Sequence, residues 1–146
     1  MSLVDAGRRV LVVEDERAIR QVLRLNLAAR GYLVDTAVTG RSAVDLVQRW
    51  RPDLVILDLG LPDMDGLEVI ARVRGFSAAP ILVISARDTP TAQAAAIAAG
   101  ASGFLLKPFG IEDFVARVGA ALRPDACLDG CLGASPGGCL AERSVS

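Results

Sequence analysis

The sequence predicts an α/β fold, a doubly wound sheet of five parallel strands covered by five helices. Short, wholly apolar runs alternate with longer segments whose apolar residues recur every three or four positions. The most apolar run, residues 54–57, ends at Asp58 and leads into a loop that contains Gly60, Pro62 and Gly66. Such a run is typical of a central parallel strand, because helices cover both faces of that kind of sheet.

Strands and helices are expected to alternate along the chain. The expected strands are residues 10–13, 32–38, 54–57, 81–84 and 104–106. The expected helices carry their apolar stripes at residues 19–27, 43–50, 67–73, 90–99 and 111–122. Thr89 followed by Pro90 predicts the start of the fourth helix, and Gly100 predicts its end. The second strand contains polar residues, as an edge strand does, and the flavodoxin-like order 2-1-3-4-5 places it outermost.

The length and composition of the chain exclude several classes of function. The chain has 146 residues, of which 52% are apolar and 23% are charged, and its formal net charge is −1. We therefore expect one globular domain, residues 8–123, after an N-terminal extension of residues 1–7. The lack of a basic excess argues against direct nucleic-acid binding. No apolar run is long enough for a membrane span or a signal peptide, so a cytoplasmic protein is expected.

Residues 124–146 show no apolar periodicity and are rich in glycine and serine. We expect them to be a disordered tail or a truncated linker. All three cysteines, Cys127, Cys131 and Cys139, lie in this segment. An odd number of cysteines without any histidine argues against a zinc site or a disulfide framework, so reduced thiols are expected.

Polar side chains stand where the expected strands end. Glu14 and Asp15 follow the first strand, Asp58 the third, Ser85 the fourth and Lys107 the fifth. In a parallel sheet these ends share one edge, so three carboxylates, a hydroxyl and an ammonium should converge there. Neighbouring carboxylates repel one another, and a divalent cation relieves that repulsion. Oxygen ligands without histidine or cysteine favour Mg²⁺.

Such a site suits phosphoryl transfer. Bound Mg²⁺ spreads the charge of the transferring group, Lys107 adds a second positive contact, and Ser85 can donate to a phosphoryl oxygen. A carboxylate can act as the nucleophile and form an aspartyl phosphate. Asp58 is the best candidate because it lies between the first and fourth strands. Asp63 and Asp65 are better placed than Asp58 to cap the third helix.

Four segments carry a resemblance to a known family. They are EDE at residues 14–16, LDLGLPDMDG at 57–66, SAR at 85–87 and GFLLKPF at 103–109. With these motifs at its strand ends, the chain resembles a two-component response-regulator receiver domain with a CheY-like fold, over residues 8–123. Residues 60–63 and 107–111 look most like the OmpR/PhoB subfamily, particularly its KdpE type.

The resemblance implies how the acidic residues are used. Asp58 would accept a phosphoryl group from a sensor histidine kinase. Mg²⁺ would be bound by Asp15, Asp58 and the backbone carbonyl of Gly60, and Glu14 would help through water. Gly60 and Arg87 flank the phosphoryl site in this pattern and would tune the lifetime of the phosphoryl group.

The resemblance also implies a switch. Ser85 would move toward the phosphoryl group, Lys107 would pair with that group, and Phe104 would turn inward as Ser85 moves. A phenylalanine in a short strand can equally be a plain core residue, so both roles remain open for Phe104. The peptide bond between Lys107 and Pro108 is expected to be cis.

Regulators of the resembled subfamily dimerise through the fourth helix, fifth strand and fifth helix, and bind DNA with a C-terminal winged helix. No winged helix follows in this sequence, so the expected output partner is a missing domain or another protein. Ser102 and Gly103 stand where the subfamily usually carries acidic residues, and residues 94–99 carry no charge. Both departures argue against a charge-paired homodimer and leave apolar contact as the alternative.

Three other functions remain open. A degenerate receiver would act only as a docking module. An FMN carrier of the flavodoxin type would need a loop rich in Ser, Thr and Gly after the first strand, where this chain has acids at residues 14–16. An aspartyl-phosphate hydrolase would need a second acid two residues after Asp58, where Gly60 stands. We therefore expect a phosphorylation switch, a phosphoacceptor that controls transcription, rather than an enzyme.

Overall fold

The computed structural model of the chain describes residues 7–86 and 89–123. Expectations for residues 1–6, for Arg87 and for residues 124–146 with their three cysteines lie outside this part. The elements follow in the order β1 (Arg9–Val13), α1 (Arg17–Ala29), β2 (Leu33–Ala37), α2 (Gly40–Trp50), β3 (Leu54–Asp58), α3 (Gly66–Arg74), β4 (Ile81–Ser85), α4 (Pro90–Ala99), β5 (Gly103–Leu106) and α5 (Ile111–Leu122). The predicted alternation of strands and helices is confirmed.

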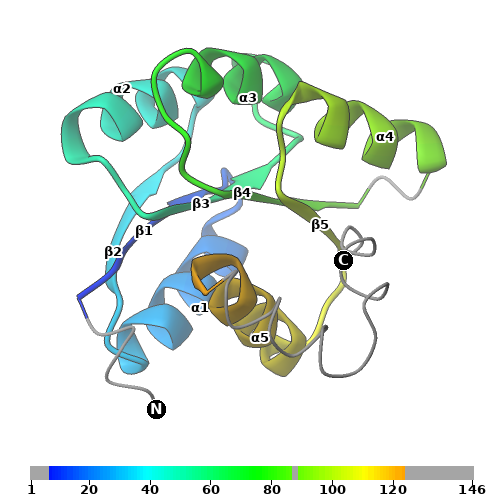
Figure 1. Cartoon of the computed structure of the whole chain (residues 1–146). Helices are drawn as coiled ribbons and strands as arrows, with labels where there is room; N and C mark the ends of the chain where they lie inside the picture. Colours follow the sequence, from blue (N-terminus) through cyan, green and yellow to red (C-terminus); the bar gives the residue numbers. More distant parts are fainter. Residues whose placement is uncertain (1–6, 87–88, 124–146) are drawn as a thin grey trace.

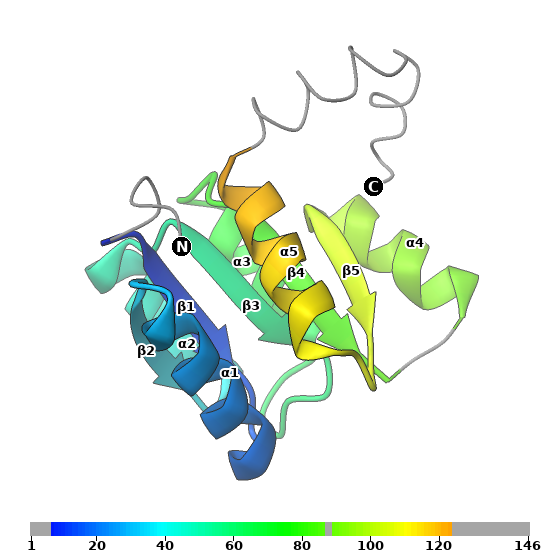
Figure 2. The same ribbon diagram turned by 90° about the horizontal axis from the view of Figure 1, so that it is seen from below.

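The strands pair in parallel in the order β2-β1-β3-β4-β5, which is the predicted flavodoxin-like, or CheY-like, order. Val13 of β1 pairs with Leu57 of β3, and Leu57 pairs in turn with Val83 of β4. Figure 2 shows the strand arrows running the same way behind α1 and α5. The carboxyl ends of the strands therefore meet at one edge of the sheet.

Helices cover both faces of the sheet: α2, α3 and α4 lie on one face, and α1 and α5 lie on the other (Figure 1). Each face has its own apolar core, which contains Leu57 on the first side and Ile56 on the second. Successive residues of β3 thus face opposite cores, and all five are buried. The edge strand β2 is exposed or half-buried until Ala37, as its polar residues predicted.

Short polar side chains begin three of the helices. Thr39, Asp65 and Thr89 accept hydrogen bonds from first-turn backbone N–H groups of α2, α3 and α4. Gly100 ends α4 with a φ of 121°, which favours glycine, so both predicted boundaries of this helix are confirmed. No helix in the described ranges has the length and apolarity needed to cross a membrane.

The loop after β3 closes tightly on itself. The backbone N–H of Gly66 donates to the carbonyl of Leu59 at 3.3 Å. A methyl group on Gly66 would place its carbon 2.7 Å from the Cα of Leu59, closer than two such atoms tolerate. This close approach of backbone to backbone requires glycine at position 66.

The tip of the same loop is fixed to a different helix from the one expected. The carboxylate of Asp63 accepts from the backbone N–H groups of Gly40 (2.6 Å) and Arg41 (3.0 Å) at the start of α2, so Asp63 caps α2 and not α3. These two N–H groups hold the pKa of Asp63 below its usual value. The loop that follows Asp58 is therefore attached to a neighbouring helix.

Adding one methyl group to this loop should destabilise the domain. We expect Gly66→Ala to lower the free energy of unfolding by about 1–3 kcal/mol, because the new carbon must push Leu59 aside. Gly110→Ala is the matched control, since an added Cβ there meets no atom within 4 Å. It should lower stability by less than Gly66→Ala does, by about 0.5 kcal/mol, because alanine is a poorer N-cap than glycine at the start of α5. Urea unfolding measures both, and equal stabilities would contradict the close packing described.

Candidate functional site

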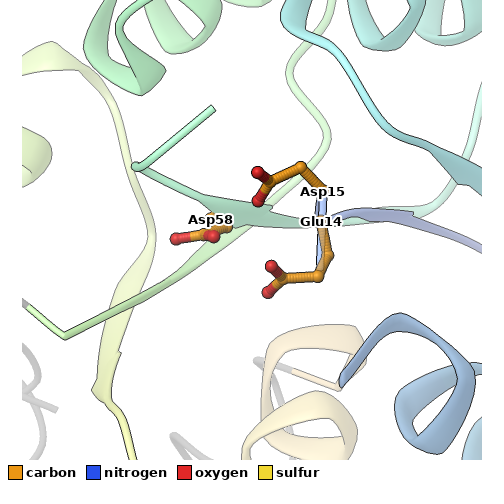
Figure 3. Close-up of side chains that lie close together, drawn as sticks. All are labelled: Glu14, Asp15 and Asp58. Atoms are coloured by element: carbon orange, nitrogen blue, oxygen red, sulfur yellow. The ribbon is translucent and has the colours of Figure 1, made fainter. Parts of the chain in front are cut away.

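The sheet brings three carboxylates together at the edge where its strands end. Glu14 and Asp15 directly follow β1, and Asp58 is the last residue of the neighbouring strand β3. One carboxylate oxygen from each residue lies within 4.8 Å of the others. Figure 3 shows Glu14 and Asp15 on opposite sides of the end of β1, both leaning toward Asp58. The predicted convergence of these acids is present in the structure.

Burial makes this cluster electrostatically costly. Glu14 and Asp58 are buried, whereas Asp15 is exposed. Burial, followed by the nearby charge of Asp58, raises the pKa of Glu14 to about 7. One oxygen of Glu14, Oε2, accepts from the backbone N–H of Glu16 at 3.1 Å. Within the described part of the chain, the other oxygen has no hydrogen-bond partner that meets standard geometry.

Lys107, in the loop after β5, supplies a positive charge to the cluster. Its Nζ lies 3.1 Å from Oε1 of Glu14 and 3.2 Å from Oδ2 of Asp58. Partial burial acts to lower the pKa of Lys107, but the contact with Glu14 and the charge of Asp58 outweigh it, and the pKa is raised. Lys107 is therefore an ammonium at neutral pH. One ammonium beside three carboxyl groups leaves the ionised cluster with excess negative charge.

Backbone and hydroxyl groups complete the edge. The N–H of Gly60 donates to Oδ1 of Asp58 at 3.2 Å, so each oxygen of Asp58 has a donor. Ser85 is buried at the end of β4, the strand beside Asp58. The backbone N–H of Lys107 donates to the carbonyl of Ser85 at 2.8 Å. Phe104, one strand further along in β5, packs partly buried against the core on the α4 side.

Two further features lie beside the cluster: the peptide bond after Lys107 and the side chain of Arg20. The peptide bond between Lys107 and Pro108 is cis, as expected. Arg20 of α1, which no sequence motif singled out, donates from Nη1 to the carbonyls of Glu14 (3.0 Å) and Asp15 (3.2 Å). Its position in the first turn is the signal that could have found it, because helical side chains lean toward the N-terminus.

The donor set of this cluster fits a hard divalent cation. Three carboxylates converge, and the chain contains no histidine. Oxygen ligands of this kind suit Mg²⁺, Ca²⁺ or Mn²⁺ better than zinc or copper. A cation would also relieve the repulsion that the single ammonium of Lys107 leaves.

The raised pKa of Glu14 predicts how stability depends on pH without metal. The unfolded chain loses the Glu14 proton near pH 4.5, and the folded chain keeps it until about pH 7. Deprotonation therefore favours unfolding between these values, so this group makes the domain less stable as the pH rises. Urea unfolding in a chelator should show wild type losing stability relative to Glu14→Gln across this window, and a difference independent of pH would contradict the burial of Glu14.

Known proteins that are similar to this chain indicate the same kind of domain as its fold and its acidic site do. Residues 10–119 match the response regulator receiver domain family. The transcriptional regulatory protein KdpE of Mycobacterium tuberculosis is 48% identical over 114 residues, which cover 78% of this chain and 50% of KdpE. Response regulator MprA of Mycolicibacterium vanbaalenii is 46% identical over 123 residues, 84% of this chain and 53% of MprA. The chain thus spans about half the length of these curated relatives.

Solved structures agree with this assignment. A two-component response regulator from Clostridium difficile superposes with a TM-score of 0.78 at 25% identity, covering 80% of this chain and 97% of that one. The BeF3-activated N-terminal receiver domain of Klebsiella pneumoniae RstA gives a TM-score of 0.76 at 28% identity, covering 80% and 99%. The resemblance to OmpR/PhoB-type receivers drawn from the motifs is confirmed. The chain belongs to the response regulator receiver domain family.

Proposed function

We propose that this chain is a phosphorylation switch in which Asp58 accepts a phosphoryl group from the phosphohistidine of a sensor kinase. The receiver unit comprises residues 8–123. The observation that carries the proposal is the cluster itself: Asp58 lies with Glu14 and Asp15 within 4.8 Å, and Lys107 is 3.2 Å from its Oδ2. Membership of the receiver family supports the same assignment.

The acidic residues would hold the cation that this chemistry needs. Asp15, Asp58 and the backbone carbonyl of Gly60 would bind Mg²⁺, and Glu14 would contribute through water. When bound, Mg²⁺ neutralises carboxylate charge and the charge of the transferring phosphoryl group. The unbalanced negative charge of the cluster supports this assignment, because Lys107 offsets only one carboxylate.

The transfer step exchanges one bond to phosphorus for another. A carboxylate oxygen of Asp58 attacks the phosphorus, the bond from phosphorus to the donor's histidine nitrogen breaks, and its electron pair stays on that nitrogen. The N–H of Gly60 orients the carboxylate of Asp58, with which it is already hydrogen-bonded. Lys107 pairs with the phosphoryl oxygens, and the hydroxyl of Ser85 donates to one of them. The chain assists its own phosphorylation and dephosphorylation and does not turn over substrates as an enzyme does.

Phosphorylation of Asp58 changes the conformation of the face formed by α4, β5 and α5. Ser85 ends β4, Phe104 lies in the adjacent β5, and α4 joins these two strands. Ser85 moves toward the phosphoryl group and Phe104 turns inward as it does so, which changes this face and controls homodimerisation or partner binding. The α4 part of the face carries no charged residue, and Ile97 is half exposed on it, which supports apolar contact. Relatives named as transcriptional regulators support control of transcription as the outcome.

Phosphorylation by a small donor tests the acceptor directly. Incubation with acetyl phosphate and Mg²⁺ should add one phosphoryl group to the chain, seen by intact mass spectrometry. Asp58→Asn removes the nucleophile, and chelation of Mg²⁺ removes the cation, so neither sample should gain mass. A phosphoryl group that still appears on Asp58→Asn would assign the acceptor to another residue.

Replacing Lys107 should separate cation binding from phosphoryl acceptance. Lys107→Met removes a positive charge beside the cluster, so Mg²⁺ should bind more tightly, by a factor of several. The same variant should accept a phosphoryl group at least about tenfold more slowly, because it lacks a donor to the transferring oxygens. Calorimetry and the mass assay measure the two effects. Unchanged phosphorylation would show that Lys107 only balances charge.

A further inference from the structure

Arg20 is tied to the backbone of both acidic residues that follow β1. Its Nη1 donates to the carbonyl oxygens of Glu14 at 3.0 Å and Asp15 at 3.2 Å, so one nitrogen bridges two consecutive peptide groups. The side chain is half-buried and belongs to the first turn of α1. Hydrogen bonds from a guanidinium to backbone carbonyls are charge-assisted and stronger than neutral ones.

The loop between β1 and α1 needs such a restraint. Glu14 and Asp15 are consecutive, yet their carboxylates lie on opposite sides of the strand end and both lean toward Asp58 (Figure 3). Their mutual repulsion favours any rotation of the intervening peptide that separates them. The side chain of Glu16, the N-cap residue of α1, makes no capping hydrogen bond. Arg20 reaches back from the helix to this loop and restrains the peptide groups on either side of Asp15.

We propose that Arg20 is a positioning residue for the cation site: it fixes these two peptide groups so that Glu14 and Asp15 face Asp58. The inference rests on the proposed function, because it assigns Arg20 to the same Mg²⁺ site. Arg20 has two effects of opposite sign. Its positive charge repels a nearby cation, whereas its hydrogen bonds to the loop preserve the ligand arrangement. The positioning effect is the larger, so removing Arg20 weakens Mg²⁺ binding.

The test compares two arginines of the same helix. Arg24 lies one turn further along α1 and donates to Oε1 of Gln21. Arg20→Ala and Arg24→Ala therefore remove the same charge, but only the first removes contacts to the acidic loop. Mg²⁺ titration by calorimetry should show the dissociation constant rising about tenfold or more for Arg20→Ala. Arg24→Ala should leave it unchanged within about twofold, or lower it.

A second measurement does not depend on the metal. Amide NMR spectra of the metal-free proteins should show shifts at residues 14–16 in Arg20→Ala, and none there in Arg24→Ala. Arg20→Lys keeps the charge and an N–H donor, so it should bind Mg²⁺ more tightly than Arg20→Ala. If Arg20→Ala does not fold, Arg20→Met replaces it, because methionine keeps the aliphatic part of the side chain and lacks the donors; a dissociation constant for Arg20→Met equal to or lower than that of wild type would overturn the inference.

The outcomes separate this inference from the proposed function. Wild-type protein that takes up no Mg²⁺ contradicts the proposed function, and the inference about the cation site falls with it. Wild-type protein that binds Mg²⁺, while Arg20→Ala binds it equally or more tightly, contradicts the inference alone. Unfolding free energies recorded on the same samples identify a purely structural role, which lowers stability without changing Mg²⁺ affinity or the spectra of residues 14–16.

Discussion

The repulsion among Glu14, Asp15 and Asp58 is the constraint on which the site depends. A parallel sheet sends the carboxyl ends of its strands to one edge, and the order β2-β1-β3-β4-β5 makes β1 and β3 neighbours. Acids that follow these two strands therefore meet, within 4.8 Å in this chain. Lys107 arrives at the same edge from β5 and offsets part of the charge. The negative charge that remains is the charge that a bound cation would offset.

The fold holds this arrangement on its buried central strands. The strands that carry the acids are buried between two apolar cores, so the strand ends cannot separate without exposing both cores. The loops beyond them are restrained by polar contacts: Asp63 attaches one to α2, and Arg20 bridges the carbonyls of the other. A site that concentrates like charge needs such support, because its own electrostatics oppose it.

Periodicity and motif spacing predicted the architecture, the strand order and the residues gathered at the sheet edge. They succeeded because wholly apolar runs mark central strands, and a polar residue directly after such a run can lie only at the strand end. The contacts of Asp63 and Arg20 were not predictable in this way. Asp63 meets residues more than twenty positions away. Arg20 contacts backbone carbonyls, which every residue carries, so its place in the first turn of α1 was the one sequence signal for this contact. The raised pKa of Glu14 likewise depends on burial, which its neighbours in sequence do not reveal.

The most direct test of the central claim is to locate a cation in crystals of the protein. Mn²⁺ prefers oxygen ligands as Mg²⁺ does, and its anomalous scattering identifies its position. The account predicts one strong anomalous peak at the carboxyl edge of the sheet, bound directly by Asp15 and Asp58. An ordered cluster at saturating Mn²⁺, with Lys107 still paired to Asp58 and no peak among the carboxylates, would contradict it.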